Sequence, residues 1–299
     1  MKTVSDLGEF GLIERIKKSM RTDSSVVKGI GDDCAVLKLD AKRYALATSD
    51  MLVEGVDFTP KDDAYLVGRK AIAASISDIA ACAGIPRYCL VSLGLPAATR
   101  VGFTERLFAG MRAIAKNYDI NIVGGDLSRA RQLVIDVSMF GVVEKKRLAL
   151  RSGAQYRDII FVSGSLGGSI AGKHLKFSPR LKEAGFLARN FKLNSMIDIS
   201  DGLVQDLTHI LRESRVGAVL YEELIPLAKS AAGLSDALYS GEDFELLFTL
   251  PLKEARRLIR KKMKFFKPIG EIRARAYGLR LIDKNNREKI LEPRGFRHF

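Results

Sequence analysis

Aspartate residues recur in short turns that also contain glycine, serine or threonine. Most of these turns follow a β-like run of residues, namely Gly29–Asp33, Ala47–Asp50, Val123–Asp126 and Ile197–Gly202, whereas Ser240–Asp243 precedes one. Carboxylate, hydroxyl and carbonyl oxygens are the hard ligands that Mg²⁺ prefers in proteins. Each turn alone is better explained as a helix cap or a turn stabilised by its own side chains. As a set, the turns indicate a magnesium site that holds phosphate groups.

Asp78 stands outside these turns, in a stretch with helical periodicity from Ala64 to Ala83. Its neighbours are mostly alanine and isoleucine, so the expected helix is apolar on nearly every side. A buried carboxylate is costly unless it is paired or bound to a metal ion. Asp78 is therefore a further candidate ligand for the magnesium site.

Histidine is too sparse for other common kinds of catalytic site. The histidines are His174, His209 and His298, and neither HExxH nor GxSxG occurs. Zinc sites are usually built from His and Cys, and hydrolytic triads need a positioned His. Carboxylates without such clusters favour magnesium over zinc.

One segment nearly matches a phosphate-binding loop. Gly167–His174 follows the β-like run Ile159–Ser163 and contains glycines and a lysine at suggestive spacing. A P-loop has Ser or Thr after that lysine, because the hydroxyl binds Mg²⁺, and here the residue is His174. We therefore interpret the segment as a tight connection from a strand to a helix.

The length and composition predict a two-domain protein of the cytoplasm. At 299 residues the chain exceeds the size at which one hydrophobic core usually stops growing, and the polar stretch Glu144–Arg147 is the expected boundary. No apolar run approaches the ~20 residues of a membrane span, and the first residues lack the order of a signal peptide. The cysteines (Cys34, Cys82 and Cys89) lack CxxC spacing, which predicts reduced core thiols.

The net charge of +14 leaves a second class of function open. A basic surface can bind nucleic acid. In Lys253–Lys264, however, Ala255, Leu258, Ile259 and Met263 fall at helical spacing, so the charges would occupy the opposite face. We interpret this stretch as a solvated helix face and expect neither nucleic acid nor a membrane as a partner.

Short β-branched or aromatic runs alternate with helical patterns along the chain, which predicts an α/β fold of mixed α+β character. The expected strands are Tyr44–Thr48, Tyr88–Leu95, Ile120–Val123, Leu133–Val143, Ile159–Ser163, Gly217–Tyr221, Glu245–Leu250 and Tyr277–Ile282. The expected helices are Glu9–Met20, Ala64–Ala83, Thr104–Asn117, Gly168–Leu175, Leu203–Glu213 and Lys253–Lys264.

In its acidic turns the chain resembles the thiamine-monophosphate kinases, within the aminoimidazole ribonucleotide synthetase-like superfamily. The similarity runs nearly end to end, through Gly8–Ile13, Gly29–Leu37, Thr48–Phe58, Ser75–Pro86, Val123–Ser128, Leu148–Gly153, Met196–Leu207, Ser240–Phe248 and Gly295–Phe299. The resemblance implies a two-domain architecture of mixed sheets with helices packed on them. Residues 1–145 would bind ATP and Mg²⁺ and form a homodimer through their sheets, and residues 146–299 would complete the active site.

The resemblance also implies roles for individual residues. Asp50, Asp78, Asp126 and Arg151 would be catalytic. The expected Mg²⁺ ligands are Asp33, Thr48, Ser49, Asp50, Asp78, Asp126, Asp198 and Asp201. The expected contacts to ATP are Gly125, Asp126, Arg151 and Ser200, and those to thiamine monophosphate are Asp57, Glu242 and Phe296. For Phe296, a tail residue anchored in the core is an equally good interpretation.

The implied reaction is direct, in-line transfer of a phosphoryl group from ATP to thiamine monophosphate, giving thiamine diphosphate and ADP. A phosphate monoester has its second pKa near ~6, so the acceptor is largely dianionic at neutral pH and needs no general base. The difficulty is electrostatic, because two polyanions must meet. Several Mg²⁺ ions would screen them.

Other readings of the sequence remain open. The chain could be a different ATP-using member of the superfamily, such as a purine-pathway synthetase, a selenophosphate synthetase or a hydrogenase-maturation protein. The first cysteine, Cys34, lies inside an acidic turn rather than near the N-terminus, and the chain ends in Phe299 rather than Cys. Both features favour the kinase. A nucleic-acid-binding protein would leave the acidic turns unexplained, and the intact carboxylates of the family motifs weigh against a non-catalytic scaffold.

Overall fold

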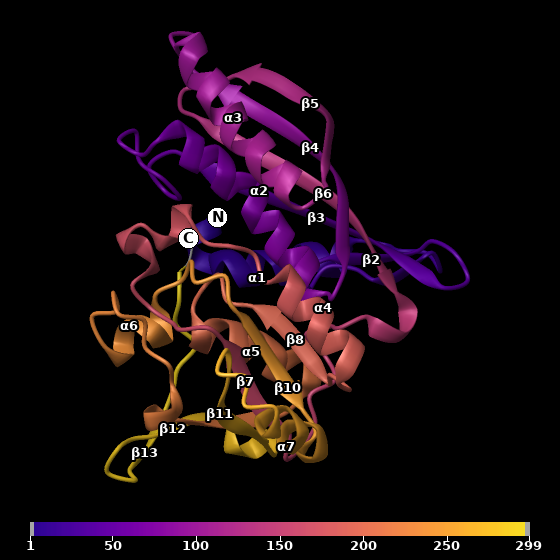
Figure 1. The fold of residues 1–299 in the computed structure, drawn as a ribbon, viewed down its shortest axis with the longest axis vertical. Coiled ribbons are helices and arrows are strands. Elements are labelled where there is room, and N and C mark those ends of the chain that lie inside the picture. The colour runs from indigo at the N-terminus through magenta and orange to yellow at the C-terminus, as the bar shows by residue number, and fades with distance from the viewer. Residues whose placement is uncertain (1–2, 297–299) are drawn as a thin grey trace.

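The computed structural model describes residues 3–296, which form two α/β halves, each built on its own sheet (Figure 1). The N-terminal half contains α1 (Val4–Ser19), β1 (Val26–Lys28), β2 (Ala35–Lys38), β3 (Arg43–Val53), α2 (Ala64–Ala81), β4 (Ile85–Leu95), α3 (Val101–Asn117), β5 (Asn121–Arg129) and β6 (Val134–Glu144). The C-terminal half contains β7 (Ile159–Ser163), α4 (Leu181–Asn190), β8 (Ser195–Asp198), α5 (Leu203–Ser214), β9 (Gly217–Tyr221), α6 (Leu234–Tyr239), β10 (Leu246–Leu250), α7 (Leu252–Arg260), β11 (Phe266–Arg273), β12 (Leu279–Ile282) and β13 (Glu288–Ile290).

Both sheets are mixed, which confirms the predicted fold class. The N-terminal sheet has the strand order β1-β2-β3-β6-β4-β5, with β4 and β5 parallel. The C-terminal sheet has the order β13-β12-β9-β11-β7-β10-β8, with β12 and β9 parallel. In Figure 1 the N-terminal sheet lies in the upper part of the view and the C-terminal sheet in the lower part.

Helix α2 is the buried centre of the molecule. Gly68 and Gly110 let the backbones of α2 and α3 touch, because a Cβ atom on Gly68 would lie 2.0 Å from the carbonyl oxygen of Leu107. A Cβ atom on Gly110 would lie 1.9 Å from the carbonyl oxygen of Tyr65. On its other side α2 contacts β8 and α4 of the C-terminal half. Side chains of α2 therefore reach both halves of the protein.

One face of the N-terminal sheet is uncovered in the single chain. The strand register pairs Met51 with Asp136, Asp136 with Ser92, and Ser92 with Asp126, so these residues share a face. The adjacent residue Asp50 lies on the opposite face, toward α2. The open face also carries exposed apolar side chains, namely Met51, Tyr88, Leu90 and Phe140.

The expected helix Gly168–Leu175 is wrong. The segment forms two 3₁₀ turns, Ser169–Ala171 and Lys173–Leu175. Gly168 and Gly172 have φ angles of 71° and 117°, which interrupt a right-handed helix. A connection that the sequence describes as helical is therefore a compact, irregular segment.

Other elements are also shorter than expected. The strand predicted from Tyr277 begins at Leu279, because a 3₁₀ turn precedes it. The helix predicted over Lys253–Lys264 ends at Arg260. Within that stretch Ala255 and Leu258 are buried, whereas Ile259 and Met263 are exposed, so its apolar face is narrower than the spacing implied.

The cysteines are free and buried, as predicted for core thiols (Cys34, Cys82 and Cys89). Within residues 3–296, no helix has both the length and the apolar character needed to cross a membrane.

Candidate active site

Three carboxylates from distant parts of the chain converge between the two halves. Asp33 comes from the turn between β1 and β2, Asp78 from α2, and Asp198 from the end of β8. One oxygen of each lies within 4.8 Å of the others. The structure thus brings together three predicted metal ligands, and both halves of the protein contribute to the group.

Hydroxyl groups orient the carboxylates of the site. Thr48 donates a hydrogen bond of 2.5 Å to Asp78. Ser75 and Ser77, both on α2, donate hydrogen bonds of 2.6 Å to Asp50 and Asp198 respectively. The two serines were not predicted as site residues. In the sequence both are small residues of a mostly apolar helix, and no local signal marks them.

The carboxylates of this cluster hold their protons more tightly than free aspartates. Burial and the neighbouring charges raise the pKa of Asp50 to about 6 and that of Asp198 to about 7, although hydrogen bonds from the serines act in the opposite direction. Burial and the charges of Asp50 and Asp198 raise the pKa of Asp78 well above its ordinary value, and burial raises that of Asp33. Carboxylates gathered in this way favour either a proton or a cation.

A divalent cation fits these residues. Asp33 Oδ2 is buried and accepts no hydrogen bond from any residue in the described part of the chain. Such an atom is costly unless a ligand satisfies it. The group of Asp33, Asp78 and Asp198 offers only oxygen, which suits Mg²⁺ better than zinc.

Arg151 contacts the same cluster from the segment after β6. Its Nε and Nη2 atoms donate to Asp33 Oδ1 at 3.2 and 2.7 Å, and its backbone N–H donates to Asp32. Burial alone would lower the pKa of Arg151, but the Asp33 charge raises it above its ordinary value. The guanidinium therefore remains charged beside the site and leaves Asp33 Oδ2 to a ligand.

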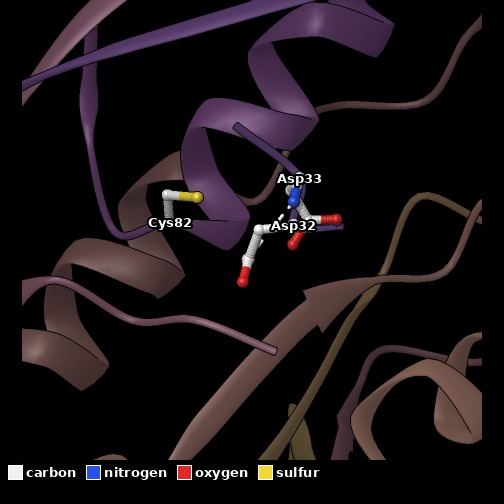
Figure 2. A group of neighbouring side chains, drawn as sticks. All are labelled: Asp32, Asp33 and Cys82. Carbon is white, nitrogen blue, oxygen red and sulfur yellow. Dashed lines mark hydrogen bonds between the residues drawn. The ribbon is translucent and has the colours of Figure 1, made fainter. Parts of the chain in front are cut away.

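Asp32 and Cys82 lie beside Asp33 near the end of α2, as Figure 2 shows. Asp32 accepts the Arg151 backbone hydrogen bond and lies 3.6 Å from the Lys28 ammonium, so its contacts stabilise the turn. The hydrogen bond with Cys34 lowers the pKa of Cys82, but burial and the charges of Asp33 and Asp32 outweigh it and keep the thiol protonated. A protonated thiol is a poor ligand for Mg²⁺.

A cavity of about 470 Å³ opens beside the carboxylates. Helix α1 closes one side of it with Phe10 and Ile13, and the predicted residues Arg151, Ser200 and Asp201 line another. The cavity combines apolar and charged walls, as a pocket for a nucleotide requires.

A second acidic group lies at the start of α5. Asp201, Asp206 and His209 place one ligand atom each within 4.8 Å of the others. Asp206, which was not predicted, accepts hydrogen bonds from the backbone N–H groups of Asp201 and Gly202 at 3.1 Å. Burial, followed by the charge of Arg151, lowers the pKa of His209 to about 3, so the ring is neutral. Unlike Asp78, Asp206 lies in a helix with many polar residues, so no local signal in the sequence marks it.

Asp126 and Gly125 do not join the cluster within one chain. They lie on β5, an exposed edge strand, and Asp126 shares the open face of the sheet with Asp136. Ser49 also turns toward this face, where it donates to Asp136 at 3.0 Å. The sequence placed these residues in the site but contained no information on which face of the sheet each would occupy.

The residues predicted to bind the acceptor lie at the edges of this region. The Asp57 carboxylate accepts from the backbone N–H of Val53 at 2.7 Å. Glu242 Oε2 lies 2.6 Å from the ammonium of Lys70, a residue that was not predicted. The backbone N–H of Phe296 donates to the Asp201 carbonyl at 3.0 Å, and the residue is 39% exposed. Phe296 is therefore not a core residue.

The segment resembling a phosphate-binding loop has a structural role. Lys173 pairs with Glu245 at 3.4 Å and with Asp243 at 3.7 Å. Asp243 also accepts from the backbone N–H of Gly167 at 2.9 Å. The lysine and the glycine-rich turn thus anchor the Ser240–Glu245 region instead of forming a P-loop.

Comparison with known proteins places this site in a family. The N-terminal domain model of AIR synthase related proteins matches residues 31–143, and the C-terminal domain model matches residues 137–281. The thiamine-monophosphate kinase of Buchnera aphidicola subsp. Schizaphis graminum is 35% identical, over 98% of this chain and 99% of the relative. That of Bacillus subtilis is 33% identical, over 98% of this chain and 100% of the relative.

Solved structures agree with this assignment. The structure of AaThiL complexed with AMPPCP and TMP has a TM-score of 0.88 and 31% identity, and the match covers 100% of this chain and 99% of that one. Escherichia coli HypE, a hydrogenase maturation protein, shares the fold at 18% identity and a TM-score of 0.73, over 95% of this chain and 98% of that one. The chain belongs to the thiamine-monophosphate kinase family.

Proposed function

We propose that this protein transfers the terminal phosphoryl group of ATP to thiamine monophosphate, giving thiamine diphosphate and ADP. The observation that carries the proposal is the convergence of Asp33, Asp78 and Asp198 from both halves of the chain. Membership of the family and the likeness to a structure complexed with AMPPCP and TMP support the choice of substrates.

Different residues of the chain would bind Mg²⁺, ATP and the acceptor. Asp33, Asp50, Asp78 and Asp198 would hold Mg²⁺ together with Thr48, and Asp201 would add a ligand at the mouth of the cavity. Bound Mg²⁺ would screen the phosphates of both substrates and stabilise charge on the transferring group. Arg151 and Ser200 line the cavity where ATP would lie. Glu242 and Asp57 would orient the acceptor for in-line attack, and the acceptor phosphate itself supplies the nucleophilic oxygen.

We also propose a boundary at residues 145 and 146 between an N-terminal and a C-terminal domain. The end of β6 at Glu144 and the start of β7 at Ile159 support it. The free thiols (Cys34, Cys82 and Cys89) support a reducing compartment such as the cytoplasm.

We further propose that two copies pair through the open face of the N-terminal sheet. That face carries exposed apolar side chains, including Met51, Leu90 and Phe140. Several exposed apolar side chains on one uncovered sheet face are typical of an interface. Pairing there would let Asp126 complete the site of the partner copy, because Asp126 lies on that face and away from the cluster in its own chain.

An acceptor panel tests the proposed reaction. Purified protein with Mg²⁺ and ATP should release ADP faster when thiamine monophosphate is added than when thiamine, selenide or a carboxamide-bearing ribonucleotide is added. Release of ADP that depends on one of the other acceptors, and not on thiamine monophosphate, would assign a different activity to the same fold.

Mg²⁺ should stabilise the protein more at pH 8 than at pH 5.5. The pKa values of Asp50 (about 6), Asp32 and Asp198 (about 7 each) are raised from 3.8, so the folded metal-free protein binds more protons than the unfolded chain. Its free energy of unfolding therefore falls as pH rises from about 4 to about 7. Mg²⁺ competes with the protons on Asp50 and Asp198 and binds best when they are gone.

Thermal unfolding with and without MgCl₂, at matched ionic strength, measures this effect. The increase in melting temperature should be several-fold larger at pH 8. An equal increase at both pH values would mean that Mg²⁺ does not bind these carboxylates.

A further inference from the structure

Lys70 on α2 is a fully buried lysine, at 0% exposure, to which the proposed reaction assigns no role. Its ammonium reaches three groups: the carbonyl oxygen of Asp57 at 2.9 Å, Oε2 of Glu242 at 2.6 Å, and Nδ1 of His174 at 3.3 Å. A buried ammonium is costly unless it is paired and hydrogen-bonded. Two of these partners belong to the residues proposed to bind the acceptor.

The partners of Lys70 come from both halves of the protein. Asp57 belongs to the turn after β3, whereas His174 and Glu242 belong to the C-terminal half. Burial, followed by the Lys70 charge, lowers the pKa of His174, so its ring is neutral near pH 7 and can accept a hydrogen bond from the ammonium. The Lys70 charge is thus shared between one carboxylate and two neutral acceptors.

Neighbouring contacts hold the segments around Lys70 in place. Arg69 donates to the carbonyl oxygens of Leu175 and Phe177. The rings of Phe177 and Phe244 stack with their centroids 3.9 Å apart. The segment that carries His174 and the turn that carries Glu242 are therefore docked onto α2 next to Lys70.

The backbone of the Glu242 turn is strained. Glu242 and Phe244 have φ angles of 68° and 50°, in the left-handed region that most side chains avoid. Hydrogen bonds from their backbone N–H groups to the carbonyls of Ser200 and Ile199, each 2.7 Å long, hold the turn against the Asp198–Asp201 region. Strain of this kind persists where the surroundings enforce it, commonly at functional sites.

The Glu242 side chain contacts Lys70 but is not fully buried. Its side chain keeps 23% of its surface exposed while Oε2 faces Lys70. Burial raises the pKa of Glu242, and the Lys70 charge acts against this rise. Lys70 therefore aims the carboxylate and favours its ionised form, against burial and the charges of Asp57 and Asp50, which raise the pKa of Glu242.

We propose that Lys70 is a positioning residue for the acceptor. Its ammonium aims the Glu242 carboxylate at the boundary between the two halves, in the arrangement that receives thiamine monophosphate. This inference rests on the proposed function, which assigns Glu242 and Asp57 to that substrate. Lys70 acts through Glu242 and does not itself touch the transferred group.

Lys70→Met tests the proposal, because methionine fills similar space without the charge or the donors. The KM for thiamine monophosphate should rise about tenfold or more, whereas the KM for ATP should stay within about twofold. Lys116→Met is the matched control, since Lys116 is an exposed lysine on α3. Its kinetic constants should equal those of the wild type.

The double variant Lys70→Met/Glu242→Gln separates positioning from bulk stability. It removes both charges, so it should fold even if Lys70→Met alone does not. If Lys70 acts through Glu242, the double variant should have the same KM for thiamine monophosphate as Glu242→Gln alone. A much higher KM in the double variant would mean that Lys70 contacts the acceptor directly, and would overturn the proposal.

Two further outcomes are decisive. A Lys70→Met protein that melts at a lower temperature with an unchanged KM for thiamine monophosphate would show a purely structural lysine. A wild-type enzyme that does not phosphorylate thiamine monophosphate would overturn the proposed function first, before any variant is compared.

Discussion

Asp78→Asn should reduce turnover at least about 10³-fold, because the loss of a central metal ligand removes ~4 kcal/mol or more of transition-state stabilisation. Asp78 lies at the centre of the carboxylates that feel one another's charge, namely Asp33, Asp50, Asp78 and Asp198. Asparagine keeps one oxygen in place but not the charge. The variant should therefore bind Mg²⁺ poorly even at concentrations that saturate the wild type.

The same variant should be more stable than the wild type when no Mg²⁺ is present. Burial and the charges of Asp50 and Asp198 disfavour the ionised form of Asp78, and the folded metal-free protein bears that cost at pH 8. Asparagine removes it, and the Thr48 hydroxyl can rotate to accept a hydrogen bond from the new amide. A higher melting temperature together with a lost activity is a combination that simple misfolding does not produce.

Asp119→Asn is the control for this experiment. Asp119 is an exposed residue whose side chain lies 3.9 Å from Arg87, and asparagine tolerates its φ of 56°. Its activity and its response to Mg²⁺ should match those of the wild type. Normal turnover by Asp78→Asn would remove Asp78 from the metal site.

Two variants that are each inactive alone should regain activity when one chain of each forms a mixed dimer. Asp126→Asn should be inactive if Asp126 serves the partner's site, and so should Asp78→Asn. In a mixed dimer, the chain with Asp126→Asn keeps its own Asp78 and receives the intact Asp126 of the partner. Random pairing should therefore recover about a quarter of wild-type activity, because one of the two sites is intact in half of the dimers.

Co-expression of the two variants with different tags, followed by purification through both tags, isolates the mixed dimer. That preparation should have about half of the wild-type activity per dimer, since one of its two equivalent sites is intact. If Asp126 acted within its own chain, neither site of the mixed dimer would be intact and no activity would return. A chain that stays monomeric would contradict the proposed pairing directly.

The sequence predicted the carboxylates of the site better than their arrangement. Asp78 was recognisable because a carboxylate is costly in an apolar helix, whereas Asp33 and Asp198 were recognisable from the recurring acidic turns and the family resemblance. In the structure one oxygen of each lies within 4.8 Å of the others, so the three carboxylates form one group. The closeness of these residues depends on how α2 docks both sheets, which no local pattern contains.

The sequence could not show which face of the sheet carries Asp126. Side chains alternate along a strand, so a shift of one residue in the register moves a side chain to the other face. Here the register places Asp126 with Ser92 and Asp136. Only the paired strands reveal that Asp50 and Asp126 point to opposite sides.

Residues that matter through tertiary contacts were missed for a related reason. Lys70 follows Arg69 in a mostly apolar helix, and its partner Glu242 is 172 positions away in the chain. Ser75 and Ser77 read as ordinary small helix residues until Asp50 and Asp198 lie beside them. Such pairs are visible only after the two halves pack together.

The most direct test of the account is the identity of the product. Wild-type protein, ATP labelled in its terminal phosphoryl group, and thiamine monophosphate should give labelled thiamine diphosphate, one for each ADP, only when Mg²⁺ is present. Chromatography of the products across a range of Mg²⁺ concentrations measures this. Absence of labelled thiamine diphosphate at every concentration, or ADP and free phosphate without it, would contradict the account.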